Sequence, residues 1–132
     1  LVHIFNPSAG YMQNCNISPA VMMKDSPLVS GKHKSYIFNV NSWERNPRGT
    51  RSLSILETDA MITKEDAFAL ATDVTDIVAP LWQRALSQSM AEVEQTGDES
   101  VKLAAKRILE WDGQYLPEAT QTVLFKAWRE ST

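Results

Sequence analysis

GYMQNCNISP, residues 10–19, is an apolar, aromatic run that contains two asparagines and ends at Ser-Pro. This stretch decides which secondary structure is expected at the start of the chain. Its asparagines, Asn14 and Asn16, are two residues apart, which would place both side chains on one face of an extended strand. Asparagine is depleted in strands because its side chain competes for backbone partners, so this pair needs a reason. One reason is catalytic, since a side-chain amide can donate to an oxyanion. The other is turn chemistry, because Asn, Ser and Pro also end strands.

Outward from this stretch, the start of the chain predicts short strands. Residues 2–5 fit a first strand and residues 11–16 a second, with a turn over residues 6–10 between them. Residues 36–40 fit either a short strand or an irregular apolar loop. We therefore predict an α+β chain, in which short N-terminal β-strands form a piece of a parent sheet and a mainly α-helical region follows.

The later part of the chain has the signals of helices. Residues 49–57 fit a short helix with Leu53 and Leu56 facing inward. Thr63 and Asp66 have the spacing of a capping box, and the helix that they open has an apolar stripe as far as residue 78. Further helix ends and starts are marked by Pro80, Gly97, Asp98 and Pro117. We expect the helices within residues 63–93 to pack against those after residue 98.

Composition narrows the class of protein. The 132 residues are 43% hydrophobic and 22% charged, with a net charge of −3, which fits a globular chain and disfavours binding to a nucleic-acid backbone. No apolar run is long enough for a membrane span. The single cysteine, Cys15, excludes an internal disulfide, and it lacks metal-ligand spacing with His3 and His33, so we predict no metal site.

Two segments resemble a known family. Residues 6–19, NPSAGYMQNCNISP, resemble the NPxxGYxxNxNxxP segment of the penicillin amidase family, which includes penicillin and cephalosporin acylases of antibiotic metabolism, acyl-homoserine-lactone acylases and lipopeptide deacylases. The second match is LEWDG, residues 109–113, followed by a helix-like run that ends near Trp128. Residues 48–56 and 63–71 fit the helical arrangement of the family between them, so the resemblance spans nearly all of the chain.

The resemblance implies an N-terminal-nucleophile hydrolase that cleaves the linear or cyclic amide of an N-acyl small molecule. In such enzymes a Ser, Thr or Cys exposed by self-cleavage attacks the carbonyl, and its own α-amino group serves as the base. The family pattern makes Asn16 the oxyanion donor and Asn14 a supporting neighbour. It also implies an arginine that positions the asparagine, which we align with Arg48, with Arg51 as the alternative.

The chain departs from the complete pattern because it lacks the nucleophile. We therefore expect residues 1–132 to be a fragment of the nucleophile-bearing chain, with a strand and loop part (1–47) and a helical part (48–132). This fragment should be inert alone and should need other segments of the same precursor.

The resemblance also bears on cofactor, compartment and partners. We expect no cofactor in the fragment, although the family implies a structural calcium in the full enzyme and a periplasmic or secreted parent. Asp25 is the only acid shortly after the asparagines, and a lone acid fits a solvated loop. Open strand edges would favour edge-to-edge self-association. The alternative class is a non-catalytic helical interaction module, in which the asparagines only end a strand.

Overall fold

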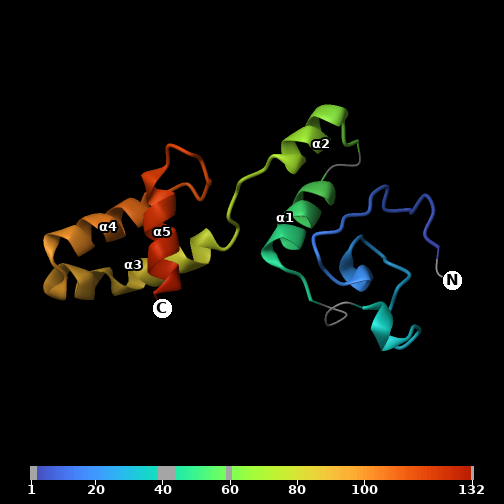
Figure 1. Cartoon of the computed structure of the whole chain (residues 1–132), viewed down its shortest axis with the longest axis horizontal. Helices are drawn as coiled ribbons and strands as arrows, with labels where there is room; N and C mark the ends of the chain where they lie inside the picture. Colours follow the sequence, from blue (N-terminus) through green and yellow to red (C-terminus); the bar gives the residue numbers. More distant parts are fainter. Residues whose placement is uncertain (1–2, 39–43, 59–60, 132) are drawn as a thin grey trace. The chain divides into compact units, whose positions relative to one another are not determined.

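The chain is helical in the computed structural model, which describes residues 3–38, 44–58 and 61–131 (Figure 1). Its α-helices there are α1 (Pro47–Leu56), α2 (Lys64–Ala71), α3 (Ala79–Thr96), α4 (Glu99–Leu109) and α5 (Thr120–Glu130), with short 3-10 turns at Pro19–Val21 and Ser35–Ile37. The chain divides into two compact units, Leu1–Asp73 and Val74–Thr132, each described here by itself.

The predicted α+β class is wrong, because the described residues contain no β-strand where we expected short N-terminal strands. Asn16, the last residue of the second predicted strand, has a backbone φ of 58°, and a residue in this left-handed region interrupts an extended strand. The backbone N–H of Asn16 donates to Oδ1 of Asn14 instead of to a second strand. The sheet edge on which we based self-association is thus missing from the described ranges.

The two other segments considered as strands form no strand where the structure describes them. Described residues 3–5 have no regular structure, while residues 1 and 2 lie outside the described ranges. The apolar segment predicted as strand or loop begins instead with the 3-10 turn Ser35–Ile37, and residues 39 and 40 are not among those described.

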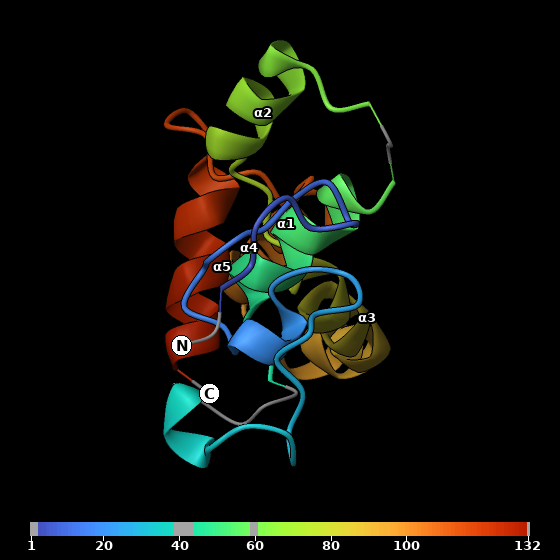
Figure 2. The same cartoon turned by 90° about the vertical axis from the view of Figure 1, so that its right-hand side faces the viewer.

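Helix α1 is the central element of the first unit, and the N-terminal loop runs beside it (Figure 1, Figure 2). It begins two residues earlier than predicted, because Asn46 caps it and Pro47 occupies its first turn. Leu53 is 1% exposed, as its inward position predicts. Among the described residues of this unit, Ile17, Met23 and Leu28 are the other buried apolar side chains.

The capping box of α2 is confirmed, but this helix ends at Ala71 instead of continuing to residue 78. The β-branched residues that follow favour an extended backbone. They pair with the later chain through the N–H of Asp76, which donates to the carbonyl of Gly113 (2.8 Å), and through the N–H of Tyr115, which donates to the carbonyl of Val74 (3.0 Å).

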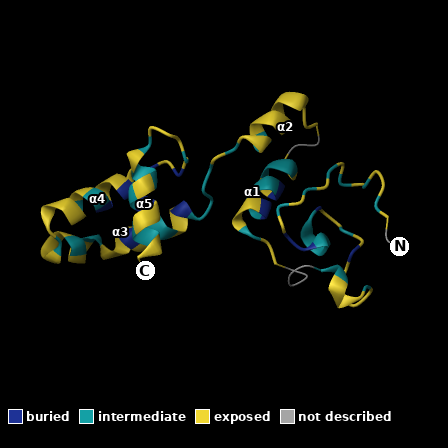
Figure 3. Cartoon of the chain, viewed as in Figure 1, coloured by how far each residue is buried: buried dark blue, intermediate teal, exposed yellow. Residues whose placement is uncertain are grey.

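The second unit packs α4 against both α3 and α5 around one apolar core, visible as the dark blue and teal inner faces in Figure 3. Gly97 ends α3 and Asp98 caps α4, as predicted, whereas α5 starts at Thr120, three residues after Pro117. The predicted packing therefore holds for α3, while α2 belongs to the other unit. The core consists of Ala79, Leu86, Ala105, Ile108, Trp111 and Phe125.

The tryptophans of this unit lie in its core or pack against it. Trp82 and Trp128 meet edge to face with ring centroids 5.5 Å apart, and Trp111 lies 4.9 Å from the Phe125 ring. Gln83 donates to the carbonyls of Ile108 and Trp111, which closes the C-terminal end of α4. Within the described residues, no helix has the length and apolar character needed to cross a membrane.

Candidate active site

Asn14 and Asn16 form a local turn instead of sharing one face of a strand. The Oδ1 atom of Asn14 accepts a hydrogen bond from the backbone N–H of Asn16 at 3.0 Å, which is an Asx turn. The turn holds Asn16 at a φ of 58°, in the left-handed region that asparagine tolerates better than most residues. Asn14 therefore supports the backbone of Asn16 directly.

The structure brings Arg48 and Asn16 together. The Nη2 atom of Arg48, in the first turn of α1, donates to Oδ1 of Asn16 at 2.8 Å and to the carbonyl of Cys15 at 3.5 Å. A guanidinium has donors only, so the Asn16 amide must present its oxygen to Arg48. Its Nδ2 group then faces away, and no described residue accepts a hydrogen bond from it.

Such an arrangement can stabilise negative charge on an oxygen atom. A charged donor fixes the orientation of the amide, and the amide offers two N–H bonds on its other side. Both Asn16 and Arg48 are exposed, so a substrate carbonyl can approach them from solvent or from a neighbouring segment. The geometry fits an oxyanion donor with its support; the catalytic roles of these residues remain predictions.

Arg51, the alternative arginine, is engaged elsewhere. Its Nη2 and Nε atoms donate to Oδ2 of Asp73 at 2.7 and 3.2 Å. Asp73 follows α2, so this ion pair ties α1 to the end of the next helix. The structure thus places Arg48, and not Arg51, beside Asn16.

Sequence reasoning missed Asn46. Its Nδ2 atom donates to the carbonyl of Cys15 at 2.6 Å, and its Oδ1 atom accepts from the N–H of Gly49 at 2.8 Å. The second bond is the N-cap of α1. The dipeptide Asn46-Pro47 ahead of a helical run was the signal, because Asn is a preferred N-cap and Pro a preferred first helical residue.

Other contacts anchor the asparagine turn to α1 and to the neighbouring loop. The hydroxyl of Tyr11 donates to Oε1 of Glu57 and accepts from the N–H of Lys24, both at 3.3 Å. Burial raises the pKa of Tyr11, so the hydroxyl keeps its proton at neutral pH. The thiol of Cys15 lies 3.5 Å from the hydroxyl of Ser52, in the middle of α1.

No metal centre is evident in the part of the chain that the structure describes, where no group of three or more His, Cys, Asp or Glu side chains is placed to hold an ion. Asp25, the acid that we considered for calcium, is exposed.

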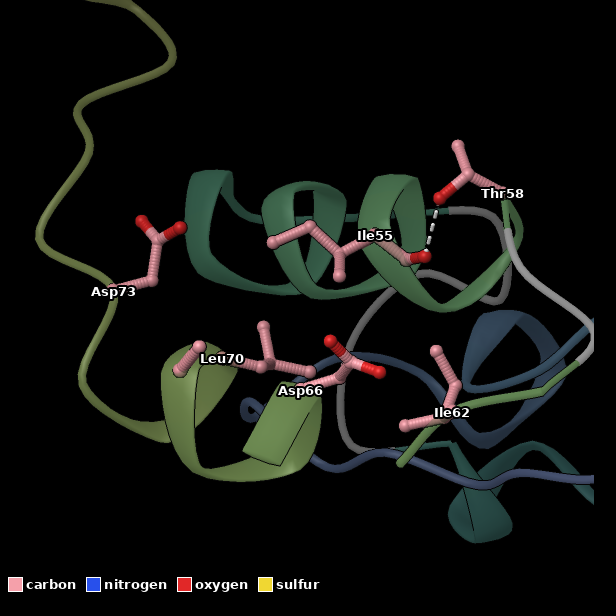
Figure 4. A pocket seen from close by; sticks show the side chains of 7 residues that line it. Ile55, Thr58, Ile62, Asp66, Leu70 and Asp73 are labelled. Atoms are coloured by element: carbon pink, nitrogen blue, oxygen red, sulfur yellow. Dashed lines mark hydrogen bonds between the residues drawn. The ribbon is translucent and has the colours of Figure 1, made fainter. Parts of the chain in front are cut away.

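Two of the hollows among the described residues of the first unit lie apart from Asn16, which lines neither. One, of about 260 Å³, lies between α1 and α2, where Ile55, Leu70 and Asp66 project toward one another (Figure 4). The other, of about 590 Å³, is lined from Ala9 to Tyr11 and by residues around the start of α2. Asn16 and Arg48 are both exposed, so this pair lies on the surface of the unit.

A family model described as penicillin amidase matches residues 1–132. Neither a curated protein nor a solved structure matches the chain.

Proposed function

Because the chain belongs to the penicillin amidase family, we propose that it supplies the oxyanion-hole asparagine, Asn16, to an N-terminal-nucleophile amidohydrolase. Membership of this family supports an acylase-like hydrolase, and the proposal adds which residue acts and how. The substrate class is an N-acyl small molecule with a linear or cyclic amide bond. Its products are a carboxylic acid and an amine.

The reaction passes through two oxyanions, and each must be stabilised by a hydrogen-bond donor. The nucleophile oxygen or sulfur adds to the amide carbonyl, and the carbonyl oxygen becomes an oxyanion to which Nδ2 of Asn16 donates. When the intermediate collapses, the C–N bond breaks, the amine leaves with a proton, and an acyl-enzyme remains. Water then adds to the acyl-enzyme through a second oxyanion at the same donor, and the carboxylic acid is released.

The nucleophile in this proposal comes from another segment of the same parent protein. It must have a hydroxyl or thiol and a free α-amino group in one residue. Residues around Asn16, such as Cys15 and Ser52, are internal to the chain and have no free α-amino group. That other segment would also close over the exposed face of Asn16 and line the acyl and amine pockets.

The observation that supports the proposal most is the bond from Arg48 to Oδ1 of Asn16. A surface asparagine in an ordinary turn needs no charged partner to orient its amide. The non-catalytic interaction module gives no reason for this pairing or for the Asx turn beneath it.

The full-length parent tests the proposal with a panel of N-acyl amides of one chromogenic amine, with aromatic, short aliphatic and long aliphatic acyl groups. We expect saturable release of the amine with equimolar acid for at least one acyl group, and none from residues 1–132 alone. Absence of turnover over the whole panel by a correctly processed parent would refute the proposal. Saturable turnover by the isolated chain would refute the separate nucleophile.

A further inference from the structure

We propose that Asn46 is a positioning residue that locks the peptide bond on which Asn16 is built. This inference rests on the proposed function of Asn16. Asn46 is half-buried, and its side chain reaches two backbone atoms. Nδ2 donates to the carbonyl of Cys15 at 2.6 Å, and Oδ1 accepts from the N–H of Gly49 at 2.8 Å.

The Cys15–Asn16 peptide bond is held at both of its polar atoms by side chains. Asn46 binds its carbonyl oxygen, and Asn14 accepts from its N–H group at 3.0 Å. A peptide unit is planar, so two bonds at opposite edges fix the rotation of the whole plane. With the plane fixed and Oδ1 held by Arg48, the donor of Asn16 has one direction left to face.

The backbone of Asn16 has an unfavourable conformation, which the bonds to the Cys15–Asn16 peptide help to hold. Asn16 has a φ of 58°, which non-glycine residues adopt infrequently and keep only where the surroundings hold them. Without Asn46, the carbonyl of Cys15 retains only the longer bond from Arg48 at 3.5 Å. The peptide plane can then rotate, and the amide of Asn16 shifts away from the position of the oxyanion.

Asn46 also caps α1, so its two functions must be separated experimentally. In Asn46→Ser the hydroxyl preserves a strong N-cap, but the side chain lacks the amide donor and is too short to replace it. In Asn46→Asp the cap is preserved at full length, and an acceptor replaces the donor that faces the carbonyl of Cys15. Both variants therefore keep the helix start and remove the lock.

The test measures kcat, KM and the melting temperature of the full-length parent with its best chromogenic N-acyl amide. We expect Asn46→Ser and Asn46→Asp to lower kcat about tenfold, because small misplacements of a catalytic group are costly, with KM changed less than about twofold. The matched control is Thr63→Ala, which removes the cap of α2 in the same unit. It should lower the melting temperature by about 2–4 °C and leave kcat unchanged.

A double-mutant cycle shows whether Asn46 acts through Asn16. Asn16→Ala should lower kcat by about 10²–10³. In that background Asn46→Ser should change kcat less than about twofold, because residues that act as one unit are not additive. If Asn46→Ser does not yield folded protein, Asn46→Asp takes its place in the cycle.

The outcomes separate the two proposals. If Asn16→Ala has its full effect but the Asn46 variants keep wild-type kcat, the lock is refuted and the proposed function stands. Equal kcat losses from Asn46→Ser in both backgrounds would also refute the lock, since Asn46 would then act independently of Asn16. If Asn16→Ala itself has no effect, the proposed function fails.

Discussion

Arg48 and Arg51 lie one turn apart on α1, yet the structure gives them different partners. Arg48 binds the side chain of Asn16, whereas Arg51 binds Asp73. The sequence alone left both arginines possible, because the stretch between Asn16 and Arg48 is prone to insertions and does not fix the alignment. Side-chain geometry distinguishes them and assigns separate effects to their loss.

We predict that Arg48→Ala and Arg51→Ala have opposite signatures in the full-length parent. Arg48→Ala should lower kcat at least about tenfold, since the Asn16 amide loses the donor that orients it. Arg51→Ala should keep kcat and lower the free energy of unfolding by about 0.5–1 kcal/mol, the usual range for a partly exposed ion pair. Steady-state kinetics and urea unfolding measure both. The reverse pattern would make Arg51 the site arginine.

The asparagine pair shows what could be predicted from single residues and what could not. The spacing of Asn14 and Asn16 and the family segment singled out both residues, and the structure brings Asn16 to Arg48. The spacing predicted both side chains on one strand face, with a turn as the alternative. Asparagine also bonds its own backbone two residues on, and that competing preference formed the turn. The predicted start of α1 at residue 49 left Asn46 outside it, although Asn followed by Pro is a favoured N-cap and first helical residue.

At the scale of elements, α1 and the asparagine loop meet at a glycine. A Cβ atom added to Gly49 would lie 2.6 Å from Cγ2 of Ile17, the residue after Asn16. Ile17 is 4% exposed, and its β-branched side chain cannot easily rotate away. Gly49 therefore lets the helix approach the loop closely enough for Arg48 and Asn46 to reach it.

We predict that Gly49→Ala destabilises the chain although alanine is the better helix former. Overpacking should lower the free energy of unfolding by about 1–3 kcal/mol, against a helix-propensity gain of about 1 kcal/mol. In an Ile17→Ala background the methyl groups are gone, and the same change should be neutral or stabilising. Urea unfolding of the four chains measures this. A stabilising Gly49→Ala in the wild-type background would contradict the close approach.

The capping box of α2 gives a prediction in pH. The hydroxyl and the backbone N–H of Thr63 donate to the carboxylate of Asp66 at 2.6 and 2.9 Å, and they hold the pKa of that carboxyl below its ordinary value. The folded chain thus binds this proton less readily than the unfolded chain. The box stabilises α2 above the ordinary pKa of about 3.9, and this contribution is lost as pH falls through the lower folded pKa.

Carbon NMR of the Asp66 carboxyl measures this pKa. We expect a midpoint below about 3.9 in the wild-type chain. Thr63→Ala removes the larger of the two causes, so the midpoint should move back up toward the ordinary value. A wild-type midpoint at or above the ordinary value would show that the box is not formed in solution.

Helix boundaries were predicted well where a cap or stop is chemically explicit, as at Thr63, Gly97 and Asp98. The predicted helix boundary was wrong where apolar periodicity continued without such a signal. The apolar stripe continues past Ala71 to residue 78, but α2 ends at Ala71 and the β-branched stretch after it pairs with residues around Gln114.

The strand predictions were wrong because the described residues offer no partner strand. A side-chain bond satisfies the backbone N–H of Asn16 instead.

The chain consists of two compact units that differ in their buried side chains. The second unit has an aromatic core, in which Trp111 is 5% and Phe125 0% exposed. Large aromatic side chains at helical spacing usually pack together. Among the described residues of the first unit, the buried apolar side chains are Ile17, Met23, Leu28 and Leu53, and the candidate site lies on the surface. No change of composition marks the division after Asp73 in the sequence.

The most direct test of the proposed oxyanion role of Asn16 is the variant Asn16→Ala in the full-length parent. Turnover of the best N-acyl amide, the extent of self-cleavage and the melting temperature are measured side by side. We predict that kcat falls by about 10²–10³, the usual loss for one oxyanion donor, while KM, self-cleavage and melting stay close to wild type. Retention of more than about a tenth of wild-type kcat in folded, processed protein would contradict the oxyanion assignment of Asn16.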